Sequence, residues 1–214
     1  MNKDLTELVF IIDKSGSMAG LESDTIGGFN GMIEHQKKES GKAIVYTVLF
    51  ASTSDVIHDR VPIEKVRPMT DEDYHIGGST ALIDAIGSAI HRIDYAHRYG
   101  QETDVPGKTI FIITTDGMEN SSKTYSYQEV RRMIEDQKRE NHWEFFFLGA
   151  NFDAVETAAK MGISSSRSVR FHNDKQGIAL NYETIDKTVR RIRKCDAVTE
   201  DWKASIQKDY STRQ

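Results

Sequence analysis

The alternation of strand and helix patterns along this chain predicts an α/β fold, a doubly wound three-layer sandwich with helices on both faces of a mostly parallel sheet. Two observations support this class. Apolar runs rich in Val, Ile and Phe, at residues 8–12 and 111–113, do not alternate with polar residues, which is typical of strands buried on both faces. Between such runs, apolar residues recur at spacings of three and four, which indicates amphipathic helices.

Six strands and five helices are expected in the order that this class requires. The strands are apolar runs bounded by Gly, Pro or polar turns, at residues 8–12, 43–50, 56–61, 109–115, 144–150 and 166–171. The helices are the segments of helical periodicity, at residues 21–38, 81–99, 126–140, 151–161 and 178–195.

Local signals justify the boundaries of these elements. The link at 51–55 is too short to hold a crossover helix, so the strands on either side should pair antiparallel as a hairpin at one edge of the sheet. Pro62 ends the second strand of that hairpin. Gly100 is placed to stop a helix, and Ser126 and Glu129 have the spacing of a capping box that opens the next one.

Three glycines lie in the first helix, at Gly27, Gly28 and Gly31. They lower its intrinsic helix propensity, so they indicate either close packing of its backbone or local flexibility. At the other end of the chain, Trp202 and Ile206 are expected to prolong the final helix beyond the domain.

The composition limits the classes of function. A length of 214 residues suits one domain with a three-layer core, which we assign to residues 1–196, with 197–214 as a helical extension or tail. A net charge of −5, with both signs mixed along the chain, argues against a nucleic-acid partner. The single cysteine, Cys195, excludes an internal disulfide and a cysteine-cluster metal site. No stretch has transmembrane length or the form of a signal peptide, so we expect a cytoplasmic protein without a membrane partner.

The first strand ends in Asp13-Lys14-Ser15-Gly16-Ser17, which puts a carboxylate and two hydroxyls on one tight loop. Ligands of an open α/β sheet bind beyond the carboxyl ends of its strands. Two later positions supply the same chemistry, because Thr80 precedes the second helix and Asp116 directly follows a buried strand. Oxygen donors without His or Cys suit a hard divalent cation such as Mg²⁺.

Asp13-x-Ser15-x-Ser17, Thr80 and Asp116 together resemble the metal-ion-dependent adhesion site of von Willebrand factor type A domains. The order and spacing match, no position of the motif is substituted, and the resemblance covers roughly residues 5–195. It implies a bacterial-type intracellular single-domain form. It also implies a sheet order of 3-2-1-4-5-6 with the hairpin strand antiparallel at one edge, which would place Asp13 and Asp116 side by side.

In this resemblance, Ser15, Ser17 and Thr80 supply hydroxyl oxygens to the cation, and Asp13 and Asp116 bind it directly or through water. One coordination position would stay open for an Asp or Glu carboxylate of a partner protein. We therefore expect a non-enzymatic, metal-dependent protein-binding module in an intracellular complex. Mg²⁺ is the expected cofactor, although the residues do not distinguish it from Mn²⁺ or Ca²⁺, and neither the partner's identity nor the oligomeric state follows from the sequence.

Two other interpretations stay open. A Mg²⁺-dependent hydrolase or phosphatase also places an Asp after a central strand, but phosphatases of the haloacid dehalogenase type need a second Asp where this chain has Ser15. A P-loop and a Gly-x-Ser-x-Gly elbow are missing, and the seven histidines are expected on the surface because nothing pairs them into a ligand set. The other interpretation is a structural type A domain whose metal site is unused.

Overall fold

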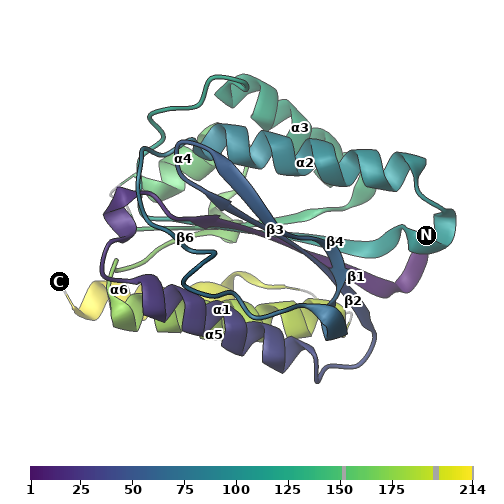
Figure 1. The fold of residues 1–214 in the computed structure, drawn as a ribbon, viewed down its shortest axis with the longest axis horizontal. Helices are drawn as coiled ribbons and strands as arrows, with labels where there is room; N and C mark the ends of the chain where they lie inside the picture. Colours follow the sequence, from purple (N-terminus) through teal and green to yellow (C-terminus); the bar gives the residue numbers. More distant parts are fainter. Residues whose placement is uncertain (151–152, 195–197, 214) are drawn as a thin grey trace.

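The computed structural model describes residues 1–150, 153–194 and 198–213, and within these ranges a six-stranded sheet separates two layers of helices (Figure 1). The strands are β1 (Asn2–Asp13), β2 (Lys42–Phe50), β3 (Ser54–Pro62), β4 (Pro106–Thr115), β5 (Glu144–Gly149) and β6 (Ser168–Arg170). The helices are α1 (Glu22–Gln36), α2 (Leu82–Tyr99), α3 (Tyr127–Asn141), α4 (Ala154–Lys160), α5 (Lys175–Arg193) and α6 (Ala204–Thr212).

The sheet order confirms the predicted fold class. The strands lie in the order β3-β2-β1-β4-β5-β6, with β3 antiparallel to β2 at one edge and the other pairs parallel. The two central strands, β1 and β4, are in register from Thr6 opposite Lys108 to Ile12 opposite Thr114. Their carboxyl ends therefore meet at the same edge of the sheet, which is where a ligand site forms in this class.

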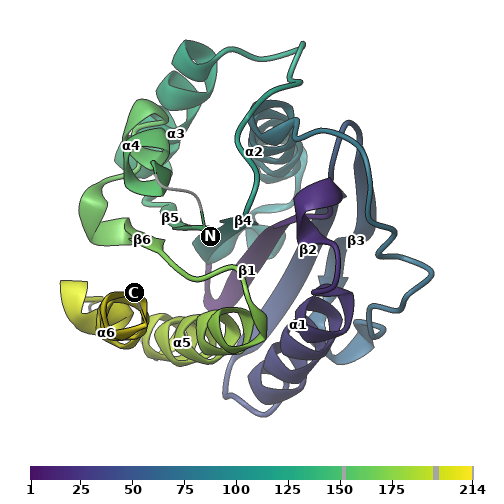
Figure 2. The same ribbon diagram turned by 90° about the vertical axis from the view of Figure 1, so that its left-hand side faces the viewer.

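Helices cover both faces of the sheet, as Figures 1 and 2 show. One layer holds α2, α3 and α4, and the other holds α1, α5 and α6. Successive residues of β1 pack into opposite layers: Phe10 and Ile12 lie in the core beneath α1 and α5, whereas Val9 and Ile11 lie in the core beneath α2. Burial on both sides explains why this strand is a continuous apolar run.

β1 begins six residues before the predicted strand, because its first half carries polar residues that hide it in the sequence. Glu7 on this strand is 0% exposed, and its carboxylate accepts from Arg60 Nε and His97 Nε2, both at 2.6 Å. The expectation that every histidine lies on the surface is wrong for His97 and for His58. His58 is buried, and both of its ring nitrogens are hydrogen-bonded: Nδ1 to Thr47 Oγ1 and Nε2 to the backbone oxygen of Arg67.

The glycines of α1 differ in their surroundings. A Cβ at Gly28 would overlap the ring of Tyr182 on α5, so this position needs glycine for close helix packing. A Cβ at Gly27 or Gly31 would meet nothing within 4 Å. The close-packing interpretation therefore holds at Gly28, which lies at the contact between α1 and α5.

The C-terminal segment does not prolong the last predicted helix. That helix, α5, ends at Arg193, and Trp202 and Ile206 lie instead on a 3₁₀ turn (Glu200–Lys203) and on α6. Both side chains are buried in the core on the α5 side of the sheet, since packing of α6 beside α5 buries more apolar surface than a helix extended into solvent. Cys195 and the proposed boundary at residue 196 lie outside the described residues, so the division into domain and extension stays a prediction.

The start of α3 agrees with the local signal that predicted it. Ser126 and Glu129 form the predicted capping box at the start of α3, with reciprocal bonds between side chain and backbone.

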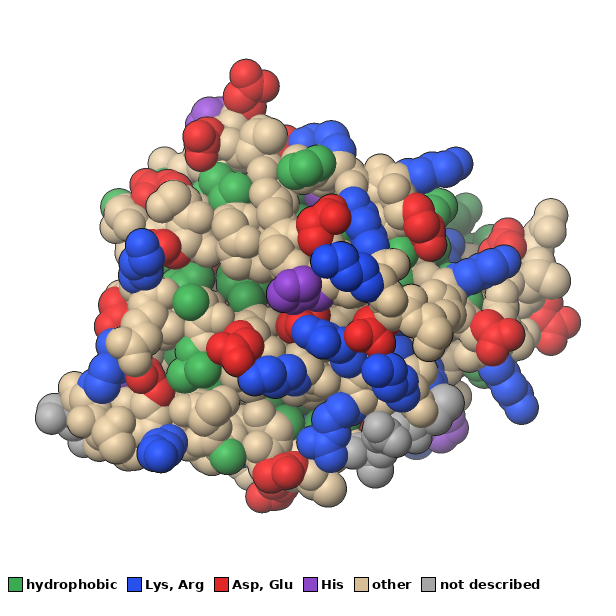
Figure 3. Space-filling model, turned by 90° about the horizontal axis from the view of Figure 1, so that it is seen from below, with side chains coloured by type: hydrophobic (Ala, Val, Ile, Leu, Met, Phe, Trp, Pro, Cys, Tyr) green, Lys and Arg blue, Asp and Glu red, His purple; other side chains and the backbone are tan. Residues whose placement is uncertain are grey.

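Lys and Arg side chains are interspersed with Asp and Glu over the face formed by α1, α5 and α6 (Figure 3). Among the described residues, no helix combines the length and apolar character that crossing a membrane requires.

Candidate metal centre

The five residues of the predicted motif lie at the carboxyl edge of the two central strands. Asp13 is the last residue of β1, and Ser15 and Ser17 follow on a loop that contains a 3₁₀ turn (Gly16–Met18). Asp116 comes directly after β4, and Thr80 lies just before the first turn of α2. Because β1 and β4 are parallel neighbours, strand pairing brings together side chains that are about a hundred positions apart in the sequence.

A continuous series of hydrogen bonds connects four of these residues. The Ser15 N–H donates to Asp13 Oδ1 at 2.7 Å, the hydroxyls of Ser15 and Ser17 are 3.2 Å apart, and Ser17 Oγ donates to Asp116 Oδ1 at 2.6 Å. The other oxygen of Asp13 accepts from the Thr115 hydroxyl at 2.5 Å. Asp13 and Asp116 are 1% and 5% exposed, so both carboxylates are held away from bulk water.

Thr80, the fifth residue of the motif, comes from the segment before α2, and its hydroxyl lies beside that of Ser15. Its N–H donates to Asn120 Oδ1 at 2.9 Å, and its carbonyl accepts from the Asn120 N–H at 3.1 Å. A Cβ added at Gly117 would overlap the Thr80 hydroxyl and would lie 3.2 Å from Ser15 Oγ. The hydroxyls of Thr80 and Ser15 therefore face one point beside Gly117, where only glycine leaves them room.

Acidic side chains tie the loop after β4 to the start of α2. Asp84 accepts from three successive backbone N–H groups, those of residues 123–125, at 2.8–2.9 Å. In the reverse direction, Glu119 on the loop accepts from the N–H of Ile83 at 2.9 Å. The bond from Ile83 satisfies an N–H group that a helix start leaves without a partner. Together, the four bonds hold the start of α2, which Thr80 precedes, against the loop that follows Asp116.

No family model and no curated protein matches the sequence of this chain. Solved structures do match. The minor pilin PilB from Streptococcus sanguinis has a TM-score of 0.61 at 11% identity, over 90% of this chain and 62% of its own. A von Willebrand factor type A structure from Catenulispora acidiphila has a TM-score of 0.55 at 16% identity, over 86% of this chain and 42% of its own.

The chain has a von Willebrand factor type A-like fold. Proximal thread matrix protein 1 from the mussel byssus, whose structure has a zinc-occupied MIDAS motif, also matches, with a TM-score of 0.55 at 13% identity over 89% of this chain and 47% of its own. The chain thus spans between about two fifths and two thirds of the length of these structures. At such identities the likeness shows the fold alone.

The carboxylates of Asp13 and Asp116 have no cationic partner among the described residues. Neutral groups donate to Asp13 and Asp116: the Ser15 N–H, the hydroxyls of Thr115 and Ser17, and the Asn173 amide. Burial raises the pKa of Asp116, the Ser17 hydroxyl opposes this rise, and the neighbouring charge of Asp13 adds to it. The site therefore holds two desolvated carboxyl groups, and no described positive side chain pairs with either of them.

The donor set fits a hard divalent cation. Two carboxylates and three hydroxyls supply oxygen only, which is the chemistry that Mg²⁺, Mn²⁺ and Ca²⁺ prefer. Among the described residues, no group of three or more His, Cys, Asp or Glu side chains is placed to hold a metal, so the hydroxyls would have to complete the ligand set here. Asp13, Ser15, Ser17, Thr80 and Asp116 are thus the residues that would hold a cation, and its chemistry there would be to attract an anionic oxygen.

Residues outside the predicted motif also contribute to the site. Thr115 binds Asp13, Asn120 holds Thr80, and Asn173 donates to Asp116 Oδ2 at 2.6 Å. Thr115 could have been selected from the sequence, because it is a hydroxyl next to Asp116 at the end of a buried strand. Asn120 and Asn173 lie in polar loops, where an asparagine has no signal that separates it from an ordinary turn residue.

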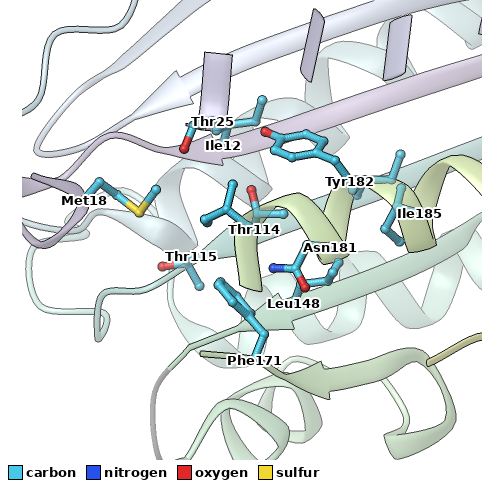
Figure 4. Close-up of a pocket in the computed structure, with 12 residues that line it drawn as sticks. Ile12, Met18, Thr25, Thr114, Thr115, Leu148, Phe171, Asn181, Tyr182 and Ile185 are labelled. Carbon is cyan, nitrogen blue, oxygen red and sulfur yellow. The ribbon is translucent and has the colours of Figure 1, made fainter. Parts of the chain in front are cut away.

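A small cavity lies beneath the site, between the sheet and α5 (Figure 4). Its volume of about 20 Å³ is room for one water molecule. Asn181 and Tyr182 on α5 and Thr25 on α1 line it, and their buried polar atoms have no hydrogen-bond partner within the described part of the chain. The cavity suits a bridging water and is too small for an organic ligand.

Proposed function

We propose that this protein is a divalent-metal-dependent protein-binding module. A cation held by Asp13, Ser15, Ser17, Thr80 and Asp116 would accept an Asp or Glu carboxylate from a partner protein. The observation that carries the proposal is the pair of buried carboxylates, which face converging hydroxyls and, among the described residues, accept hydrogen bonds from neutral donors only.

Electrostatics supports a bound cation. An isolated carboxylate taken out of water loses several kcal/mol of solvation unless an opposite charge or a metal compensates it. Here two carboxylates are buried side by side, so a dication would relieve both losses at once. Mg²⁺ takes six oxygens in near-octahedral geometry, so five protein groups leave a position for a partner's oxygen.

The neutral character of three donors supports binding of a carboxylate in particular. Hydroxyls fill coordination positions without reducing the charge of the cation, so the cation retains attraction for an anionic group. Mg²⁺ is our first choice of cation, with Mn²⁺ and Ca²⁺ as alternatives that the same oxygens would accept. The cytoplasmic location and the intracellular complex stay predictions.

The geometry favours binding over catalysis. Both oxygens of Asp13 accept hydrogen bonds and the side chain is 1% exposed, which does not suit a nucleophile that must attack a phosphorus or carbonyl atom. We propose that the protein is not an enzyme. Phosphatase and esterase screens in the presence of Mg²⁺ should show no turnover above the level of an Asp13→Ala variant, and turnover that depends on Asp13 would contradict this proposal.

Calorimetric titration tests the metal site. The metal-free wild type is titrated with Mg²⁺ and with Mn²⁺, beside a Ser15→Ala/Ser17→Ala variant. The matched control is Ser164→Ala/Ser166→Ala, because these two serines lie outside the site, have the same spacing, and have hydroxyls that also pair, at 2.7 Å.

We expect binding in the wild type and the control and loss of binding in the Ser15/Ser17 variant. Equal affinity in all three proteins, or no binding of either cation to the wild type, would refute the assignment. A pull-down with immobilised protein, in Mg²⁺ and then in chelator, would test the partner. A partner released by the chelator from the wild type, and not retained by the Ser15/Ser17 variant, is the expected result.

A further inference from the structure

The loop between β6 and α5, residues 171–174, connects the candidate metal site to α6. Asn173 in this loop donates from Nδ2 to Asp116 Oδ2 at 2.6 Å, while the other carboxylate oxygen, Oδ1, accepts from Ser17 at 2.6 Å. Both oxygens of Asp116 therefore have a fixed donor. Ser17 belongs to the predicted motif, whereas Asn173 comes from a part of the chain that the motif does not include.

α6 holds the residues on either side of Asn173. The ring of His172 stacks on Tyr210 with centroids 4.5 Å apart, and His172 Nε2 is 3.2 Å from the backbone oxygen of Tyr210. On the other side, Arg213, which directly follows α6, donates to Asp174 at 2.5 Å and also to Asp209 on that helix at 2.5 Å. The loop is thus attached to the last described turn of α6 at two points.

The same loop is also fastened to α5. Asp174 is the N-cap of that helix and accepts from the N–H of Gly177 at 2.8 Å. A Cβ at Gly177 would overlap the carbonyl oxygen of His172, so the loop lies directly against the first turn of the helix. With its neighbours held from two helices, Asn173 has little freedom to turn away from Asp116.

We infer that Asn173 is a positioning residue of the metal site, and that α6 keeps it in place through His172 and Asp174. This inference rests on the function proposed above. A carboxylate near a metal binds best when a fixed donor orients it, and loss of such an outer donor typically lowers metal affinity 10–100-fold. The C-terminal segment would then contribute to metal binding, although none of its residues belongs to the motif.

The first test is the affinity for Mg²⁺ of an Asn173→Ala variant, measured by calorimetry at a temperature where circular dichroism shows it folded. We expect the dissociation constant to rise about 10-fold or more, since Asp116 loses the donor that orients it. A merely structural role in the loop would lower the melting temperature of the metal-free protein and leave the affinity of the folded protein unchanged. That second pattern would overturn the inference.

The second test asks whether α6 acts through Asn173. Arg213→Ala removes the contact with Asp174, and Lys208→Ala is the control, because it removes the same charge from an exposed position on the same helix. We expect weaker Mg²⁺ binding in the Arg213 variant and wild-type binding in the Lys208 variant. In the Asn173→Ala/Arg213→Ala double variant, the affinity should equal that of Asn173→Ala alone, because the arginine has no positioning residue left to hold.

The outcomes separate this inference from the proposed function. A wild type that binds neither Mg²⁺ nor Mn²⁺ would overturn both. A wild type that loses Mg²⁺ binding with Ser15→Ala/Ser17→Ala, but keeps it with Asn173→Ala, would leave the proposed function standing and overturn the role of Asn173. Additive losses in the double variant would overturn the role of α6 as the support of Asn173.

Discussion

The narrow space beside Gly117 makes a Gly117→Ala substitution a sharp test of the metal site. The added methyl carbon would lie 3.1 Å from Thr80 Cγ2 and 3.2 Å from Ser15 Oγ, and would overlap the Thr80 hydroxyl. To reach an ordinary contact distance of about 3.5 Å, the Thr80 hydroxyl must move by roughly 1 Å. Since Mg²⁺ requires oxygens at about 2.0–2.1 Å in near-octahedral geometry, a ligand displaced this far no longer coordinates.

The size of the effect follows from linkage between binding and folding. Loss of a group that only orients a ligand typically lowers metal affinity 10–100-fold, so for loss of a direct ligand we take the upper end, about 100-fold, as the least expected effect. At a Mg²⁺ concentration 100 times the wild-type dissociation constant, binding stabilises the wild type by about 2.7 kcal/mol. The variant, at about its own dissociation constant, would gain only about 0.4 kcal/mol. For a chain of this length, these gains correspond to melting shifts of about 5–11 °C and about 1–2 °C.

The assay is thermal unfolding of each protein without metal and at that one Mg²⁺ concentration. Gly31→Ala is the matched control, because the same methyl group there meets nothing within 4 Å. We expect the control to keep the full wild-type shift and Gly117→Ala to lose most of it. A Gly117→Ala protein that shows the wild-type shift would refute the reasoning, since the hydroxyls of Thr80 and Ser15 could not then both face the cation beside Gly117.

Three further predictions concern the fold. Glu7→Gln should cost about 3–5 kcal/mol in urea unfolding, because it removes the buried negative charge that pairs with Arg60, whereas Arg131→Ala at an exposed pair should cost under about 1 kcal/mol. Gly28→Ala should cost about 1–3 kcal/mol in the same assay, since its methyl group meets the Tyr182 ring. Burial lowers the pKa of His58, so the unfolded chain binds its proton first, and stability should fall as pH drops below about 6.5, less so in His58→Gln.

Each of these expectations has a clear contrary result. Equal costs for Glu7→Gln and Arg131→Ala would mean that the buried carboxylate contributes no more than a surface ion pair. A Gly28→Ala protein as stable as Gly31→Ala would contradict the close contact of α1 and α5. Parallel pH profiles of the wild type and His58→Gln between pH 7 and 5 would show that this imidazole is not held neutral by the fold.

Local signals in the sequence were enough for the fold class and for the elements nearest to the site. The run at residues 8–12, the short link of the hairpin and the capping box at Ser126 each depend on residues within a few positions of one another, so a linear pattern contains them. The motif residues Asp13 and Asp116 were found in the same way, each as an acid at the end of a buried run. Their convergence followed only from a sheet order that the family resemblance supplied.

The tertiary structure decided the contacts that depend on the register of distant segments. The buried carboxylate of Glu7, in a central strand, is stabilised by Arg60 and His97, which lie 53 and 90 positions away in the sequence. In the sequence, Asn173 is an ordinary polar loop residue; only the pairing of the strands brings it to Asp116, 57 positions away. Helical or strand periodicity reports which face of one element is buried, but it contains no information on which side chains of other elements that face will meet. Only the packed fold specifies those partners.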